Sequence, residues 1–338
     1  MSCAVRTRQL MPRRVSLQSS ALVAAIAVLM LTASSASEPA AGASTAAIPV
    51  TVYDHTGLRL ADILWTGRRF LYVENTTNAV WAQGSPPSLF ASMPRVVEET
   101  RCVMSPGAHG FPSGYLFCHA PDNVLYRIRS DGTVTVFARL PDTSVSDGAL
   151  AFDTVGRFGF RLLAATGRSG SPNNDGGAVF GVTAAGAVRS IGHYSARGAG
   201  GADEIALAPA RFGTASGQLV LTVDAGKHGA LVTMDARGRT REIATLPDGP
   251  NPIVAVPATR PRPTGGRAGL YVTDTNSTNV FYVPASKLSA YAGMLVVGTE
   301  IGASFWVVSQ DGPTFRSRRI PLTLPGSNFN LEGAKFVG

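Results

Sequence analysis

The chain has 338 residues, of which only 15% are charged, while 37 are glycine and 22 are proline. This composition suits many short strands joined by tight turns, and one all-β domain of this length is ordinary. The formal net charge of +8 overstates the basic character, because residues 1–36 hold four arginines and no acid and the rest of the chain carries +4. The remaining basic residues are scattered, so we expect no nucleic-acid binding.

Residues 1–36 have the order of an export signal. Four arginines open the chain, residues 21–31 are an unbroken apolar run, and small residues follow at 33–37. The run is too short to cross a bilayer as a mature helix. We therefore predict a cleaved signal peptide over residues 1–36, with an uncleaved anchor as the alternative.

The export route is open, because Arg13-Arg14 resembles a twin-arginine signal and the general secretion route fits equally well. Residues 37–47 are rich in alanine and serine and should be a flexible lead-in. We expect one domain over residues 48–338, no stable membrane span in the mature chain, and a secreted protein located in the periplasm or outside the cell.

The stretch over residues 116–140 shows the pattern of an antiparallel meander. Residues 116–119 are a short apolar strand, residues 124–129 a second, and Ser130-Asp131-Gly132 turns the chain into a third. Period-two alternation broken by Asp-Gly and Pro/Asn turns is typical of hairpin-connected strands. Five other segments repeat its first half. Together the six second strands begin at Leu71, Leu116, Leu162, Val220, Leu270 and Leu295.

Sheet units recurring at this spacing predict an all-β fold, a β-propeller. We predict six blades, although five or seven are also compatible with the repeats. An inner strand is expected before each of the first five second strands, over residues 60–65, 101–105, 149–153, 205–209 and 253–257. The last two repeats are close together, so two strands are missing there. Residues 48–53 and 330–337 could supply them and close one blade from both termini.

Two cysteines remain after the signal segment, Cys102 and Cys118. They lie on two consecutive predicted strands, and pairing Ser105 with Tyr115 places the two cysteines directly opposite each other in the antiparallel register. Residues at such positions are close enough for a disulfide, which we predict. The alternative is a pair of buried thiols.

Polar residues recur where the inner strands begin. Alignment of these strands places Asp147, Asp203, Asn251 and Glu332 at equivalent positions around the expected central channel. Carboxylates gathered on one axis repel each other unless they are protonated or neutralised by a cation, and hard oxygen ligands suit Ca²⁺ or another divalent ion. The alternative is that these residues only begin strands through turn hydrogen bonds.

The repeated L-Y-V-x-D strands, the S-D-G turns and the E-G-A, D-G-A and N-P starts of the inner strands resemble a known superfamily. It is the six-bladed propeller superfamily of the gluconolactonase/regucalcin-like and NHL-like type, and the resemblance covers residues 50–338. Gluconolactonase-type members bind a divalent metal in the channel and hydrolyse lactones. The resemblance implies Glu332, Asn251 and either Asp147 or Asp203 as metal ligands. The E-G segment here is C-terminal and reads E-G-A, which departs from the family pattern.

Two classes of function follow. The first is a metal-dependent hydrolase of small lactones or esters at the channel, with Asp203 and Glu204 as catalytic carboxylates. The second is a non-catalytic propeller that binds a protein, glycan or small molecule through its loops. We expect a monomer in either case.

Overall fold

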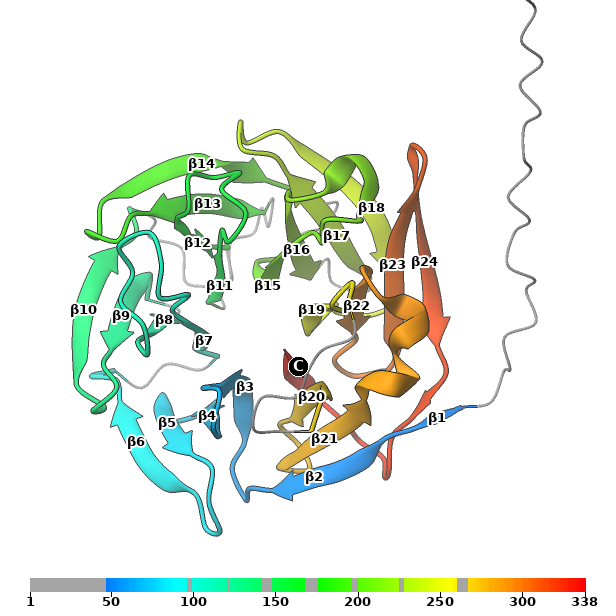
Figure 1. The fold of residues 1–338 in the computed structure, drawn as a ribbon, viewed down its shortest axis with the longest axis horizontal. Coiled ribbons are helices and arrows are strands. Elements are labelled where there is room, and N and C mark those ends of the chain that lie inside the picture. Colours follow the sequence, from blue (N-terminus) through cyan, green and yellow to red (C-terminus); the bar gives the residue numbers. More distant parts are fainter. Residues whose placement is uncertain are drawn as a thin grey trace, which may run out of the picture. The chain divides into compact units, whose positions relative to one another are not determined.

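The computed structural model describes residues 47–95, 99–120, 122–141, 148–167, 176–195, 200–224, 228–259 and 267–338. Within this part of the chain, six four-stranded sheets stand around a central axis (Figure 1). The predicted six-bladed propeller is therefore confirmed, and the five- and seven-bladed alternatives are wrong. The predicted signal peptide and nearly all of the lead-in lie outside the described residues and stay predictions.

The first four blades take their strands consecutively from the chain, with the inner strand first. Blade 1 consists of β3 (Leu60–Trp65), β4 (Phe70–Glu74), β5 (Ala79–Ala82) and β6 (Ser88–Ser92). Blade 2 consists of β7 (Arg101–Met104), β8 (Leu116–Ala120), β9 (Val124–Ile128) and β10 (Val134–Arg139). Blade 3 consists of β11 (Ala149–Phe152), β12 (Leu162–Ala165), β13 (Gly177–Val182) and β14 (Val188–Tyr194). Blade 4 consists of β15 (Ala202–Leu207), β16 (Leu219–Asp224), β17 (Gly229–Met234) and β18 (Thr240–Leu246).

The last two blades are interleaved. Blade 5 consists of β19 (Ile253–Ala255), β22 (Leu295–Gly298), β23 (Phe305–Asp311) and β24 (Thr314–Ile320). Blade 6 consists, from the axis outward, of β26 (Leu331–Val337), β20 (Gly269–Asp274), β21 (Asn279–Pro284) and β2 (Thr51–His55). A short parallel pair, β1 (Ile48–Pro49) with β25 (Leu322–Thr323), adds a further link between the terminal parts of the chain.

The pairing of β19 corrects one expectation. The strand at Ile253 was predicted to pair with the second strand at Leu270, but Ile253 lies opposite Val297 of β22. The inner edge of β20 is instead occupied by β26, with Leu270 opposite Phe336. The hairpin β20–β21 is therefore an excursion of the chain into the next blade before it returns to finish blade 5.

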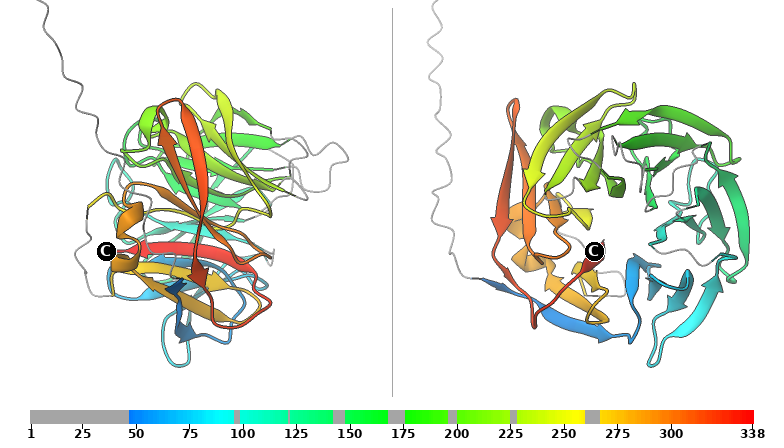
Figure 2. Two further views of the ribbon diagram at one scale, coloured as in Figure 1. Left: turned by 90° about the vertical axis from the view of Figure 1, so that its right-hand side faces the viewer. Right: turned by 180° about the vertical axis from the view of Figure 1, so that it is seen from behind.

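Both termini complete blade 6, as expected, with β26 at the axis and β2 at the rim (Figures 1 and 2). Aromatic rings fasten this blade to blade 1. The ring of Tyr53 on β2 meets Tyr271 edge-on at 4.8 Å between centroids, and Tyr271 lies 4.5 Å from Phe70 of blade 1. The Tyr72 hydroxyl also donates to Asp54 Oδ2 at 2.7 Å. Such ring pairs add about 0.5–1.5 kcal/mol each beyond the area they bury.

The glycine turns that recur between third and fourth strands have a packing role as well as a local one. Each turn between the third and fourth strands of blades 2, 3 and 4 carries a glycine at positive φ. A Cβ atom there would collide with a backbone carbonyl of the preceding blade's outer strand. The three contacts join Gly132 to Phe90, Gly186 to Phe137 and Gly238 to Ile191. These glycines therefore allow neighbouring blades to approach closely at the rim.

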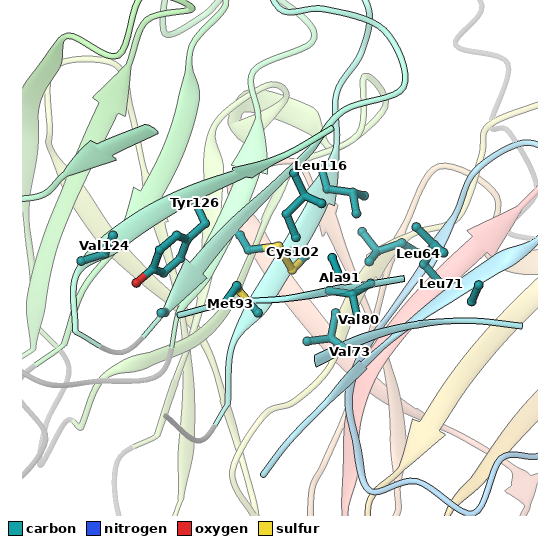
Figure 3. Close-up of a cluster of buried hydrophobic side chains, with 14 residues drawn as sticks. Leu64, Leu71, Val73, Val80, Ala91, Met93, Cys102, Leu116, Val124 and Tyr126 are labelled. Atoms are coloured by element: carbon teal, nitrogen blue, oxygen red, sulfur yellow. A yellow bond between two sulfur atoms is a disulfide. The ribbon is translucent and has the colours of Figure 1, made fainter. Parts of the chain in front are cut away.

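The core lies between the blades. One cluster packs blade 1 against blade 2 and includes Leu64, Leu116 and Tyr126 (Figure 3). Full burial of side chains of this kind contributes about 1.5–3 kcal/mol each. Cys102 lies opposite Cys118 in this cluster, with the two Cα atoms 4.0 Å apart, and a disulfide joins them. The predicted pairing is confirmed.

The described residues hold three single-turn 3₁₀ helices, Gly213–Ala215, Ala285–Lys287 and Ser289–Tyr291. None of the helices in this part of the chain has the length and apolar character needed to span a bilayer.

Candidate active site in the central channel

The inner strands contact one another around the axis, from β3 through β7, β11, β15 and β19 to β26 and back to β3. Polar side chains at or next to the first residues of these strands meet at one end of the ring. Arg101 opens β7, Glu332 is the second residue of β26, and Asn251 lies two residues before β19. This end of the channel is where the alignment of the repeats predicted a site.

Glu332 is the residue on which these side chains converge. The Arg101 guanidinium donates from Nη2 to Glu332 Oε2 at 2.7 Å, and Asn251 Nδ2 donates to the same oxygen at 3.0 Å. Asn330 Nδ2 donates to Oε1 at 3.0 Å. Arg101 and Glu332 each expose only 2% of their surface. The pair is therefore a buried salt bridge with both carboxylate oxygens engaged.

Blade 1 holds Arg101 from the other side. Arg101 Nη1 donates to the carbonyl oxygen of Ala61. The buried Asp62 carboxylate next to it accepts the amides of Cys102, at 2.9 Å, and Ile63, at 2.7 Å. These contacts fix the start of β7, so the guanidinium position is set by two blades and by the disulfide strand that follows it.

Partly exposed carboxylates surround the buried pair. Glu204 Oε2 accepts the amide of Ile253, which ties blade 4 to blade 5. Glu99 and Glu300 are also partly exposed, and both act electrostatically on Glu332 and Arg101. Lys335 of β26 is the second basic residue of the group and interacts electrostatically with Asp62 and Glu204. Acidic groups thus outnumber basic ones here.

Burial shifts the ionisation of these groups. Burial raises the pKa of Glu204 to about 8 and that of Glu332 to about 7, against the opposing effect of Arg101. The pKa of Glu300 also rises to about 7, through burial and the neighbouring Glu332 charge. Burial disfavours the charged form of Arg101, but the carboxylates outweigh it and raise its pKa further. Carboxyl groups with pKa values near neutral pH are common where proton transfer takes place.

The residues present do not fit the divalent ion that the sequence predicted at Glu332. Both Glu332 oxygens accept N–H donors, one of them from a guanidinium, so a metal would have to displace a fixed positive charge. Asn251 Oδ1 is buried without a hydrogen-bond partner among the described residues. One such oxygen is far from the six to eight that Ca²⁺ takes. The described residues also contain no group of three or more His, Cys, Asp or Glu placed to hold a metal.

The structure brings some of the predicted site residues together and does not describe others. Glu332 and Asn251 are in direct contact, as their equivalent positions suggested. Asp203 is buried at the start of β15, and its neighbour Glu204 reaches the charged group. Asp147 lies outside the described residues. Their roles as metal ligands or catalytic groups stay predictions.

Arg101 is the residue that sequence reasoning missed. The polar strand starts were interpreted as oxygen ligands for an external cation, whereas the chain supplies its own cation, Arg101, at the start of an inner strand. The signal was present, because Arg101 follows Glu99 and Thr100 at the level of the other polar strand starts. An arginine opening a strand that is otherwise apolar requires a buried partner.

The fold and the charged channel end define a six-bladed propeller with a polar site on its axis. No family model matches the chain, and no curated protein matches it. Among solved structures, it is similar to the periplasmic gluconolactonase of Pseudomonas aeruginosa, with 13% identity, 79% of this chain and 68% of that chain covered, and a TM-score of 0.43.

A catalytically inactive variant of virginiamycin B lyase from Staphylococcus aureus gives 12% identity, 81% and 75% coverage and a TM-score of 0.46. A protein of unknown function from Desulfotomaculum acetoxidans gives 12% identity, 80% and 74% coverage and a TM-score of 0.43. The six-bladed propeller fold is shown by the sheets of this chain itself.

Proposed function

We propose that the protein hydrolyses small lactones or esters at the charged end of the channel. The observation that carries this proposal is the position of Glu204. It is a partly exposed carboxylate, held through Oε2 by the Ile253 amide, beside a guanidinium that is fixed by its own contacts. Because burial raises the pKa of Glu204 to about 8, its ionised form, which predominates above that pH, is the one suited to general base catalysis.

Glu204 takes a proton from a water molecule as that water attacks the acyl carbon. The acyl C–O bond then breaks, and the proton returns from Glu204 to the departing oxygen, so water is added across the bond. Arg101 does not need to touch the substrate, because its charge offsets the negative charge that accumulates among the surrounding carboxylates. Arg101 thus neutralises the carboxylates, which is the role that the sequence analysis assigned to a metal ion.

We also propose that the protein is exported, because residues 1–36 have the sequence features of a signal peptide. The protein would then bind its substrate in the periplasm or outside the cell. A propeller that binds its ligand without turnover is the alternative, and the same experiment separates the two.

The test is a panel of sugar lactones and short-chain esters, with the purified chain assayed in the presence and absence of a chelator. We expect hydrolysis of at least one compound, at a rate that the chelator leaves unchanged. Activity that is lost with chelator and restored by Ca²⁺ would support the metal-dependent mechanism instead. Saturable binding of a panel member with no hydrolysis would identify a binding protein.

A further inference from the structure

Four arginines line a pocket at the junction of blades 3 and 4. The pocket has a volume of about 340 Å³, and its wall is formed by Arg157, Arg161, Arg189 and Arg237 together with the apolar side chains of Phe158 and Ile191. No acidic side chain lines it. The volume falls within the range of small-molecule sites.

The pocket and the charged channel end lie at opposite ends of the strands. Arg157 and Arg161 belong to the connection from β11 to β12, and Arg237 belongs to the turn from β17 to β18. The channel residues stand instead where the inner strands begin. Because successive strands of a blade are antiparallel, these connections lie at the other end. The pocket is therefore a separate site.

The loop that carries Arg157 is held by a buried carboxylate. Asp153 accepts five backbone amides: Oδ1 those of residues 155, 156 and 157, at 2.9–3.3 Å, and Oδ2 those of residues 158 and 160, at 2.7 and 2.9 Å. Asp153 is only 3% exposed. Its charge is thus committed to shaping the loop, and the arginine side chain is presented from a fixed backbone.

Glycines leave room for the arginine stems and bring the two blades together. A Cβ on Gly181 would lie 2.9 Å from Arg161 Cδ, and one on Gly217 would lie 3.0 Å from Arg157 Cγ. A Cβ on Gly192 would lie 2.7 Å from the Cα of Gly238 in the neighbouring blade. The last contact places the turn carrying Arg237 against the strand carrying Arg189.

None of the four guanidiniums has an acidic partner within 4.0 Å among the described residues. The nearby Asp235 is already paired with Arg239, at 2.6 Å. Other exposed arginines do find carboxylates, as in the pairs Arg95–Asp122 at 3.2 Å and Arg316–Asp311 at 3.3 Å. Arg157, Arg189 and Arg237 are exposed, so water and salt screen their mutual repulsion, but an anion in the cavity would meet several guanidinium donors that no carboxylate occupies.

A second, polar pocket adjoins the first. It has a volume of about 200 Å³, shares Arg157 and Arg237 with the first pocket, and is also lined by polar side chains, those of Thr214, Ser216, Gln218 and the carboxylate Asp235. Hydroxyl and amide groups of this kind match the hydroxyls of a sugar. The combined site thus offers guanidiniums at one side and, at the other, hydroxyl and amide groups beside Asp235, whose carboxylate is paired with Arg239.

We infer that this site binds a sugar carrying a phosphate or sulfate ester. Guanidinium groups donate two parallel hydrogen bonds to the oxygens of such an anion, which lysines cannot do. The anionic ester lies among the four arginines, and the sugar ring extends toward Thr214 and Ser216. Phosphate and sulfate esters share the tetrahedral oxyanion that the arginines recognise.

The test is isothermal titration of the full chain with a hexose phosphate, a hexose sulfate, inorganic phosphate, inorganic sulfate and the uncharged hexose, all at one ionic strength. We expect saturable binding of an ester with one site per chain, weaker binding of the inorganic ion, and none of the hexose. The tighter of the two esters identifies the source of the anion. Glu204→Gln should leave this binding unchanged, which separates it from the channel chemistry.

Arg189→Gln and Arg237→Gln should each weaken binding roughly tenfold or more, since each removes a charge-assisted contact. Arg68→Gln is the matched control, because Arg68 is exposed in the corresponding connection of blade 1. Melting temperatures should stay unchanged in all three variants. Absence of saturable binding would overturn the inference, as would equal weakening by Arg68→Gln. Binding confined to long polyanions would overturn it too.

Discussion

The Arg101 guanidinium and the Glu332 carboxylate meet at 2.7 Å in the centre of the propeller, although 231 residues separate them in the chain. Both side chains are only 3% exposed. The pair joins the inner strand of blade 2 to the strand that closes the ring. A buried pair of this kind gives little net stability, but the loss of one partner leaves an uncompensated charge.

Arg101→Met should therefore lower the free energy of unfolding by about 3–5 kcal/mol. Glu332 and its neighbours would be left buried without their cation. Urea denaturation of the purified protein measures this loss. The double variant Arg101→Met/Glu332→Gln should recover part of it, because the orphaned charge is removed as well. A loss below about 1 kcal/mol in the single variant would contradict the role given to the pair.

The disulfide should contribute about 3 kcal/mol, because it closes a loop with a sequence separation of 16 residues. Replacing both Cys102 and Cys118 with alanine should lower the unfolding free energy by this amount in denaturant titrations. Alkylation followed by mass spectrometry should detect these two thiols only after reduction. Free thiols in the untreated protein, or equal stability of the alanine variant, would contradict this expectation.

His119 should make the fold sensitive to acid. It is fully buried on β8, with Nε2 3.4 Å from Asn123 Oδ1, and burial lowers its pKa from 6.5 to about 4. Between about pH 6.5 and 4, His119 therefore binds a proton in the unfolded chain but stays neutral in the folded chain. Stability should fall as the pH drops from about 6.5 to 4, by about 3 kcal/mol in total from this residue.

The measurement is the unfolding free energy as a function of pH for the wild type and for His119→Gln. The difference between the two curves isolates His119, since the channel carboxylates titrate in both proteins. His193→Gln is the control, because His193 is exposed. Parallel curves for wild type and His119→Gln between pH 7 and 4 would show that the buried imidazole is not responsible.

Calcium should leave the melting temperature unchanged. Glu332 Oε2 already accepts donors from Arg101 and Asn251, so a cation gains no free carboxylate there. Thermal melts over a calcium titration test this directly, with Glu332→Ala and Asn251→Ala as comparison variants. A saturable rise in the wild type that both variants lose would support the metal site that the sequence predicted.

The sequence was sufficient for the architecture because the repeats carry local information. Alternating apolar residues and glycine turns recur with each blade, and the register of Ser105 with Tyr115 correctly placed Cys102 opposite Cys118. The order of the last strands could not be predicted in this way. The strand at Ile253 fits the inner edge of either neighbouring second strand, and the choice depends on where β26 docks.

The sequence predicted where in the channel the site lies, but not which charged groups interact there. Equivalent strand starts correctly brought Glu332 and Asn251 together. The partner of Glu332 could not be inferred, because Arg101 lies in a different blade, 231 residues away in the chain, and no local pattern links the two residues. The arginine pocket was also missed, since Arg157, Arg189 and Arg237 are scattered in the sequence and meet only through blade packing.

The most direct test of the proposed function is the kcat/KM of Glu204→Gln on the best substrate of the panel, relative to the wild type. We expect a fall of about 100-fold or more, as is usual for loss of a general base, with the melting temperature retained. Glu242→Gln, an exposed change on β18 of the same blade, should leave kcat/KM unaltered. An unchanged kcat/KM in Glu204→Gln would contradict the assignment of hydrolysis to this end of the channel.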